Sequence, residues 1–133
     1  AGLHTYHVEA GDLDLLNHNC GDGVSIYRTP KDSAKDFELD NGPNVANHQG
    51  GNRMVYFGEQ SVASEYLGRR GFANGMIRYD MDERFLREFS DRAFRYDWQG
   101  PKGSPRIEFE IPVDRISRFN ELTRGRFWIP GAS

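Results

Sequence analysis

Short stretches in which apolar and polar residues alternate recur along the chain and predict β-strands. Val24–Thr29 alternates β-branched or aromatic residues with polar ones and is ended by Pro30. Apolar, strand-forming residues also fill Arg53–Gly58 and Gly75–Met81. Further strands are expected at Leu3–Glu9, Pro105–Val113 and Arg126–Pro130. The pattern therefore predicts a chain rich in short strands.

Apolar residues three or four positions apart follow several of these strands and predict short helices. Glu59–Arg70 has this spacing, with glycines at its end. A near-repeat places an Asp at a helix N-cap after each of two strands, at Asp82–Phe89 and Asp114–Leu122. The 133 residues therefore predict a single α+β domain, residues 1–133, with a mixed, mainly antiparallel sheet and short helices packed on it.

One long polar segment interrupts the strand and helix signals. After a short helix capped by Thr29 or Asp32, Asp36–Asn52 is rich in Gly and Asn and is expected to be a loop. A loop of this length inside a small domain is usually functional or mobile. We expect it to cover a cleft or to meet a target.

Composition narrows the class of protein. Hydrophobic residues make up 37% and aromatic residues 13% of the chain, so a small core built from large rings is expected. The net charge of −3, without a dominant basic tract, argues against a non-specific nucleic-acid surface. Cys20 is the single cysteine, which excludes an intramolecular disulfide. No apolar run is long enough to cross a membrane, so no membrane association is expected.

Common metal and nucleotide motifs are absent from the sequence. The four histidines, at positions 4, 7, 18 and 48, do not have the spacing of a zinc site, and no complete calcium loop is present. Neither a phosphate-binding loop nor a strand-linked dinucleotide fingerprint occurs. We therefore expect no metal.

Two strand-borne features carry candidate binding groups. The first is Tyr27–Arg28, where the guanidinium is suited to clamp an anionic ligand, although this feature taken alone is better explained by a solvated arginine on an edge strand. The second is the segment from Tyr56 and Phe57, at a strand end, through Ser61 to Tyr66 in the following helix. Its rings would form a slot for a flat heteroaromatic ligand, or would be ordinary core aromatics.

A third feature is the pair of carboxylates at Glu108 and Glu110. On a strand, both point to one face while Phe109 points to the other. Like-charge repulsion makes such a pair costly, and proteins accept this cost at sites of acid–base or hydroxyl-binding chemistry. A solvent-facing edge strand explains the pair equally well.

The order of the three features resembles the ADP-ribosyltransferase superfamily, in which three strand-borne motifs build an NAD-binding cleft. Ile26–Thr29 is similar to the arginine-bearing first motif, and Tyr56–Tyr66 to the strand-to-helix unit with paired tyrosines. Glu108–Glu110 resembles the E-x-E of arginine-modifying toxins. The features mix the diphtheria-toxin-like and arginine classes, and the Ser-Thr-Ser of the latter is absent. The resemblance implies an ADP-ribosyltransferase-like split β-sheet.

The resemblance also implies a function. Arg28, with Tyr27 beside it, would anchor a phosphate or ribose of NAD, and Tyr56 or Phe57 would stack the nicotinamide with Tyr66. Ser61 would add a hydroxyl. One of Glu108 and Glu110 would stabilise the developing charge and the other would act on the acceptor.

Such mixtures of motifs are common in bacterial polymorphic toxins, delivered as C-terminal domains of large secreted proteins. The resemblance therefore implies a mono-ADP-ribosyltransferase toxin domain that acts on a macromolecule in the recipient cell's cytoplasm and is countered by a cognate immunity protein. Two other functions remain open from the residues themselves. One is a toxin ribonuclease using His48, His4 or His7 with Glu and Arg. The other is a non-enzymatic protein-binding module.

Overall fold

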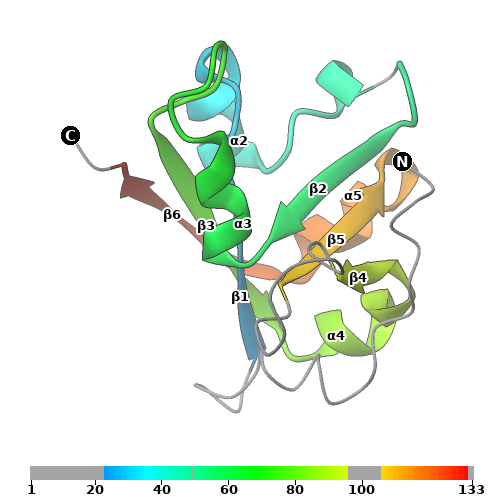
Figure 1. Ribbon diagram of the computed structural model, residues 1–133. Helices are drawn as coiled ribbons and strands as arrows, with labels where there is room; N and C mark the ends of the chain where they lie inside the picture. Colours follow the sequence, from blue (N-terminus) through cyan, green and yellow to red (C-terminus); the bar gives the residue numbers. More distant parts are fainter. Residues whose placement is uncertain (1–22, 49, 96–105, 132–133) are drawn as a thin grey trace.

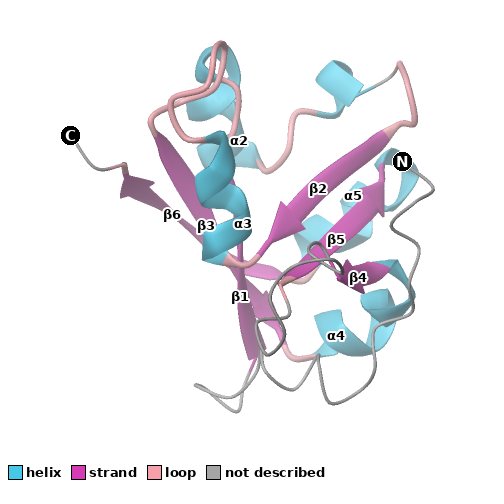
Figure 2. Cartoon of the chain, viewed as in Figure 1, coloured by secondary structure: helices cyan, strands magenta, loops and turns pink. Residues whose placement is uncertain are grey.

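A computed structural model describes residues 23–48, 50–95 and 106–131. Six strands form one sheet in the order β4-β5-β2-β1-β3-β6 (Figures 1 and 2). The strands are β1 Gly23–Arg28, β2 Met54–Gly58, β3 Gly75–Asp82, β4 Ala93–Arg95, β5 Ile107–Pro112 and β6 Thr123–Pro130. The short helices are α2 Lys35–Asn41, α3 Gln60–Ala63, α4 Arg84–Phe89 and α5 Ile116–Glu121. The predicted α+β class is confirmed.

The strands of the described ranges pair in one direction only. All five strand pairs found there are antiparallel. A short apolar run looks the same in both kinds of sheet, and its direction is set by the connections that return the chain. The prediction of a mainly antiparallel sheet is therefore confirmed, and the described strands show no parallel pair.

The sheet is split between β1 and β2. These strands pair at a single register position, Tyr27 opposite Gly58. By contrast, β1 pairs with β3 along its whole length. Beyond the Tyr27–Gly58 junction β1 and β2 diverge, and the divergence is visible between the two halves of the sheet (Figure 1). The split creates an opening in the sheet that side chains must line.

The core lies on one face of the sheet, under α4 and α5. Phe119 of α5 is at its centre, with its ring 4.4 Å from that of Phe57 and 5.8 Å from that of Phe85. Phe89 of α4 meets Phe119 edge-on. Each ring buries more apolar area than an aliphatic side chain, so a few of them stabilise a small core. The other members of the core are mainly aliphatic strand residues (Val24, Ile26, Val55, Ile77, Met81, Ile107, Ile111).

Two features of the chain differ from the prediction. The segment expected to be a loop, Asp36–Asn52, contains most of α2 and a 3₁₀ turn at Val45–His48. The short strand β4 was not predicted, because three residues give too little pattern. The expected strand Leu3–Glu9 lies outside the described residues, as do His4, His7, His18 and Cys20.

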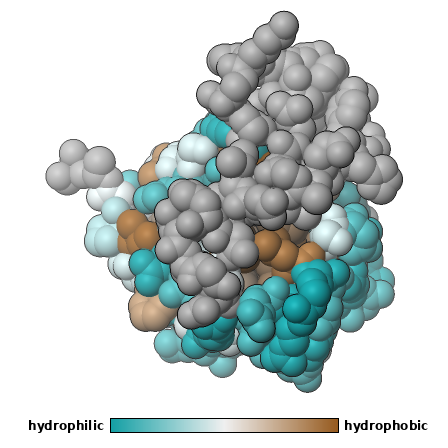
Figure 3. All heavy atoms as spheres, turned by 90° about the horizontal axis from the view of Figure 1, so that it is seen from below, coloured by the Kyte–Doolittle hydropathy of each residue, from teal (hydrophilic) through white to brown (hydrophobic). Residues whose placement is uncertain are grey.

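On the face seen from below, the visible described residues are mostly hydrophilic, and apolar residues lie near the centre and at the left edge (Figure 3). No helix in the described ranges is both long and apolar enough to span a membrane.

Candidate functional site

A pocket of about 160 Å³ lies at the split in the sheet. Its walls come from the diverging strands β1 and β2, from β5, and from α3 and the turn after it. Residues from segments far apart in the sequence line it: Tyr27, Arg28, Thr29, Lys31, His48, Tyr56, Phe57, Gly58, Val62, Ala63, Tyr66, Phe72 and Glu108. The pocket therefore joins parts of all three motif-bearing segments.

Six of the eight predicted site residues line this pocket: Tyr27, Arg28, Tyr56, Phe57, Tyr66 and Glu108. Ser61 and Glu110 do not. The side chain of Ser61 is exposed, and its carbonyl accepts a hydrogen bond from Arg106. Glu110 is opposite Tyr56 in the β2–β5 register. The structure thus separates the two carboxylates, with Glu108 in the pocket and Glu110 beside it.

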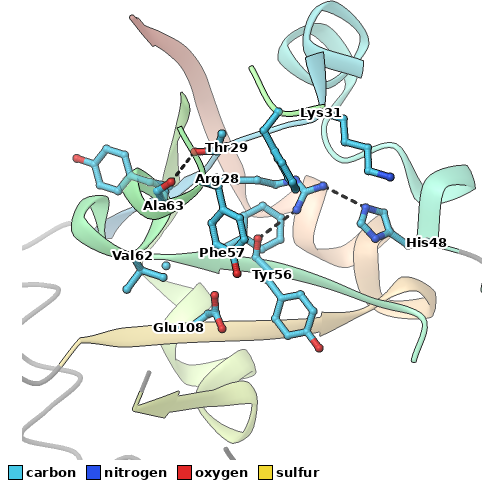
Figure 4. A pocket seen from close by; sticks show the side chains of 13 residues that line it. Arg28, Thr29, Lys31, His48, Tyr56, Phe57, Val62, Ala63 and Glu108 are labelled. Carbon is cyan, nitrogen blue, oxygen red and sulfur yellow. Dashed lines mark hydrogen bonds between the residues drawn. The ribbon is translucent and has the colours of Figure 1, made fainter. Parts of the chain in front are cut away.

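Strand register explains why Glu108 reaches the pocket. Tyr27 of β1 is opposite Gly58 of β2, and Gly58 is opposite Glu108 of β5. Cross-strand partners place their side chains on the same face, and Gly58 has none. The gap over Gly58 therefore leaves room between Tyr27 and Glu108. Glu108 points from β5 toward the space between Val62 and Phe57 (Figure 4).

We expect Gly58→Ala to destabilise the domain and to narrow the pocket. An added Cβ would lie 2.9 Å from Cγ1 of Val62, so α3 would have to move. Overpacking of this kind costs about 1–3 kcal/mol. Chemical denaturation would measure the loss. Gly50→Ala is the matched control, because no heavy atom lies within 4 Å of a Cβ there. Equal stability of the two variants would contradict this account of Gly58.

The carboxyl group of Glu108 is in an unfavourable environment for a charge. It is 7% exposed. Burial, followed by repulsion from Glu110 and Glu65, raises the pKa of Glu108 to about 8. Within the described chain, no donor forms a hydrogen bond to this carboxylate. A buried carboxyl with a strongly raised pKa in a pocket is characteristic of functional sites.

Arg28 is bound within the protein rather than free in the pocket. Its Nε donates to Glu38 Oε1 at 3.0 Å, and its Nη1 donates to the Tyr56 carbonyl at 3.3 Å. Nη2 lies 3.1 Å from Nε2 of His48. The Arg28 and Glu38 side chains are 11% and 1% exposed. Arg28 therefore bridges the split between β1 and β2 where backbone hydrogen bonds have ended.

His48 is neutral in this arrangement. Arginine can only donate, so Nε2 of His48 accepts from Arg28 and is unprotonated. Burial and then the charge of Arg28 lower the pKa of His48. His48 and Lys31 both lie on the side of the pocket away from Val62 and Ala63 (Figure 4).

The aromatic residues divide between pocket and core. Phe57 is 1% exposed and stacked on Phe119, so its ring borders the pocket from the core side. Tyr56 and Tyr66 are half-buried, and Tyr66 packs on Phe72 with ring centroids 5.4 Å apart. Of the two candidates in β2, Tyr56 is therefore the one whose ring is available to stack a ligand.

Hydrogen bonds hold α3 against the strands. Thr29 Oγ1 donates to the carbonyl of Ala63 at 2.6 Å, and the side chain of Glu59 accepts from the Ile107 amide at 2.6 Å. These contacts fix the pocket wall that carries Val62 and leads to Tyr66.

Sequence reasoning missed Glu38 and Lys31. Both lie in a polar part of the chain, where an isolated charge is normally solvated. The signal for Glu38 was its place between Phe37 and Leu39 in a helical stretch, which the glycines and asparagines after it obscured. His48 was named only for the ribonuclease alternative, yet it lines the same pocket as the other candidates.

Nothing in the described ranges suggests a metal centre, since no three His, Cys, Asp or Glu residues cluster there. The chain matches no protein-family model, no curated protein and no solved structure. Its site must therefore be interpreted from its own geometry.

Proposed function

We propose that the pocket holds the nicotinamide end of NAD and that the domain is a mono-ADP-ribosyltransferase. The main support is the position of Glu108, a buried carboxyl that shares an apolar pocket with Tyr27, Tyr56 and Tyr66. Rings suit a flat heteroaromatic ligand. A carboxylate suits the positive charge that NAD carries on its nicotinamide and then develops on its ribose. The proposal extends to a secreted toxin acting on a macromolecule in the recipient cell.

In the proposed reaction, an acceptor displaces nicotinamide from the ribose of NAD. The bond between the ribose C1′ and the nicotinamide nitrogen breaks, and its electron pair neutralises the pyridinium. The positive charge passes to the ribose, where Glu108 stabilises it in the ionised form that the cationic ring of bound NAD favours. An acceptor nucleophile then bonds to C1′ and loses its proton. In this proposal Glu110, which is opposite Tyr56 in the β2–β5 register, receives that proton.

We expect the domain to release nicotinamide from labelled NAD and to transfer the label to a component of a bacterial lysate. Tyr66→Ala should weaken NAD binding about 10- to 100-fold, because stacking on an aromatic ring contributes about 1–3 kcal/mol. Tyr66→Phe keeps the ring and should remain close to the wild type. If wild-type protein neither binds nor cleaves NAD, the proposal is wrong.

A ribonuclease is the second candidate, because His48, Lys31 and Glu108 line one pocket. Such an enzyme needs a general base and cations near a phosphate. The same preparation distinguishes the two functions. Degradation of RNA without NAD, abolished by His48→Ala, would support the ribonuclease and exclude the transferase.

A further inference from the structure

Two cationic side chains, Arg28 and Lys31, line the pocket together with the neutral His48. They differ in their partners. Arg28 is paired with Glu38 and also contacts the carbonyl of Tyr56 and the ring of His48. These contacts occupy four of its five N–H donors when the contact of Nη2 with Glu38 Oε2 at 3.5 Å is included. The charge of Arg28 is also compensated by a carboxylate that is almost fully buried. A phosphate would have to compete with this pair.

Lys31 has no such partners within residues 23–48, 50–95 and 106–131. Its side chain is exposed and lines the pocket, and among the described residues its ammonium has no ion pair or hydrogen bond. Its backbone, by contrast, is held in place by a bridge to Phe72 and by a hydrogen bond from the Ala34 amide. In the described part of the protein, Lys31 therefore presents a positive charge without an ion-pair partner, from a backbone that is held in place beside the pocket.

The charge of Lys31 acts on the pocket. Burial and the charge of Arg28 lower the pKa of His48 most, and the charge of Lys31 adds to this effect. Figure 4 shows Lys31 on the same side of the pocket as His48, away from Val62. If the ring of a ligand bound between the aromatic residues, an anionic group attached to that ring would extend out of the pocket close to the Lys31 ammonium.

We propose that Lys31, and not Arg28, binds the diphosphate of NAD. Arg28 acts instead as a positioning residue that holds β1, β2 and His48 together across the split. The inference rests on the proposed function, because it takes NAD as the ligand. It departs from the role that the sequence resemblance gave to Arg28.

The test compares NAD and ADP-ribose, which both carry the diphosphate, with nicotinamide, which lacks it. In Lys31→Ala, affinities for NAD and ADP-ribose should fall about tenfold, as expected for loss of a charge-assisted hydrogen bond. The affinity for nicotinamide should not change. Lys31→Arg should restore most of the loss. Calorimetry or a fluorescence titration on the full chain would measure each affinity.

Lys35→Ala is the matched control, because it removes the same charge four residues further along the chain. Lys35 lies over the ring of Trp128 at 4.3 Å and does not line the pocket. The NAD affinity of the Lys35→Ala variant should match that of the wild type. The NAD affinity of the wild type should also fall with added salt, and that of Lys31→Ala should fall less.

The outcomes separate the two proposals. If the wild type binds NAD and Lys31→Ala binds it equally well, the role of Lys31 is wrong and the proposed function stands. An equal loss of nicotinamide affinity in Lys31→Ala would also overturn the role proposed for Lys31, since the residue would then act on the whole pocket. If the wild type binds none of the three ligands, the proposed function fails and this inference fails with it.

Discussion

Glu108→Gln is expected to abolish activity and at the same time to make the domain more stable at alkaline pH. Without the carboxylate, the charge developing on the ribose loses its stabilising partner, and the rate should fall about 10²- to 10³-fold. The stability gain arises because the folded protein holds this carboxyl in a site that disfavours its charge. Removing the ionisable group removes that cost.

The sign of the pH dependence follows from the raised pKa. The pKa of Glu108 rises from 4.5 in the unfolded chain to about 8 in the folded protein. Between these values the folded protein binds more protons than the unfolded chain, so stability falls as pH rises through this window. The cost is complete above the folded-state pKa and is on the order of a few kcal/mol. Glu108→Gln should therefore raise Tm at about pH 9 by about 5–10 °C.

Thermal denaturation across the pH range, together with nicotinamide release, would test both effects. Glu110→Gln is the matched control, because it lies two residues away on the same strand face but does not line the pocket. It removes only the repulsion that Glu110 adds to the effect of burial on Glu108, so it should reproduce only a minor part of the alkaline rise in Tm. Retained activity in Glu108→Gln would exclude a role for this carboxyl in the reaction. A lower Tm at alkaline pH would show that the carboxylate stabilises the fold.

Glu38→Ala should destabilise the domain by about 3–5 kcal/mol, because it leaves the Arg28 charge buried without a partner. Arg28 is 11% exposed and Glu38 1% exposed, so water cannot replace the lost carboxylate. Breaking the pair should also release the contacts of Arg28 with the Tyr56 carbonyl and with His48. NAD binding and nicotinamide release should therefore decrease together with the stability of the domain.

Two comparisons make this result interpretable. Glu121→Ala removes one of the two carboxylate partners of Arg118, which also pairs with Glu88, from an exposed pair with side chains 65% and 40% exposed, and should cost much less than Glu38→Ala. The double variant Arg28→Met/Glu38→Leu replaces both charges by apolar groups and should recover much of the loss. Denaturant unfolding would measure all three. If Glu38→Ala and Glu121→Ala cost the same, the buried pair does not hold the split together.

Much of the secondary structure followed from local pattern. The strands at Val24–Thr29, Arg53–Gly58 and Gly75–Met81 form within a residue or so of their predicted ends. Alternation is a property of neighbouring residues, so it can be read along the chain. The prediction of a loop at Asp36–Asn52 was wrong, because the glycines and asparagines of this segment obscured a helix that is held by tertiary contacts. Glu38 in that helix is buried only because Arg28 comes from another element to meet it.

The candidate site was predicted as three separate segments, and the sequence determined their residue types and their order. Only the tertiary structure decided that Tyr27, Tyr66 and Glu108 share a pocket and that Glu110 and Ser61 do not line it. It also decided that Arg28 is paired while the ammonium of Lys31 has no partner among the described residues. These distinctions depend on strand register, on the split between β1 and β2, and on burial. All three arise from contacts between residues far apart in the chain, which no local pattern specifies.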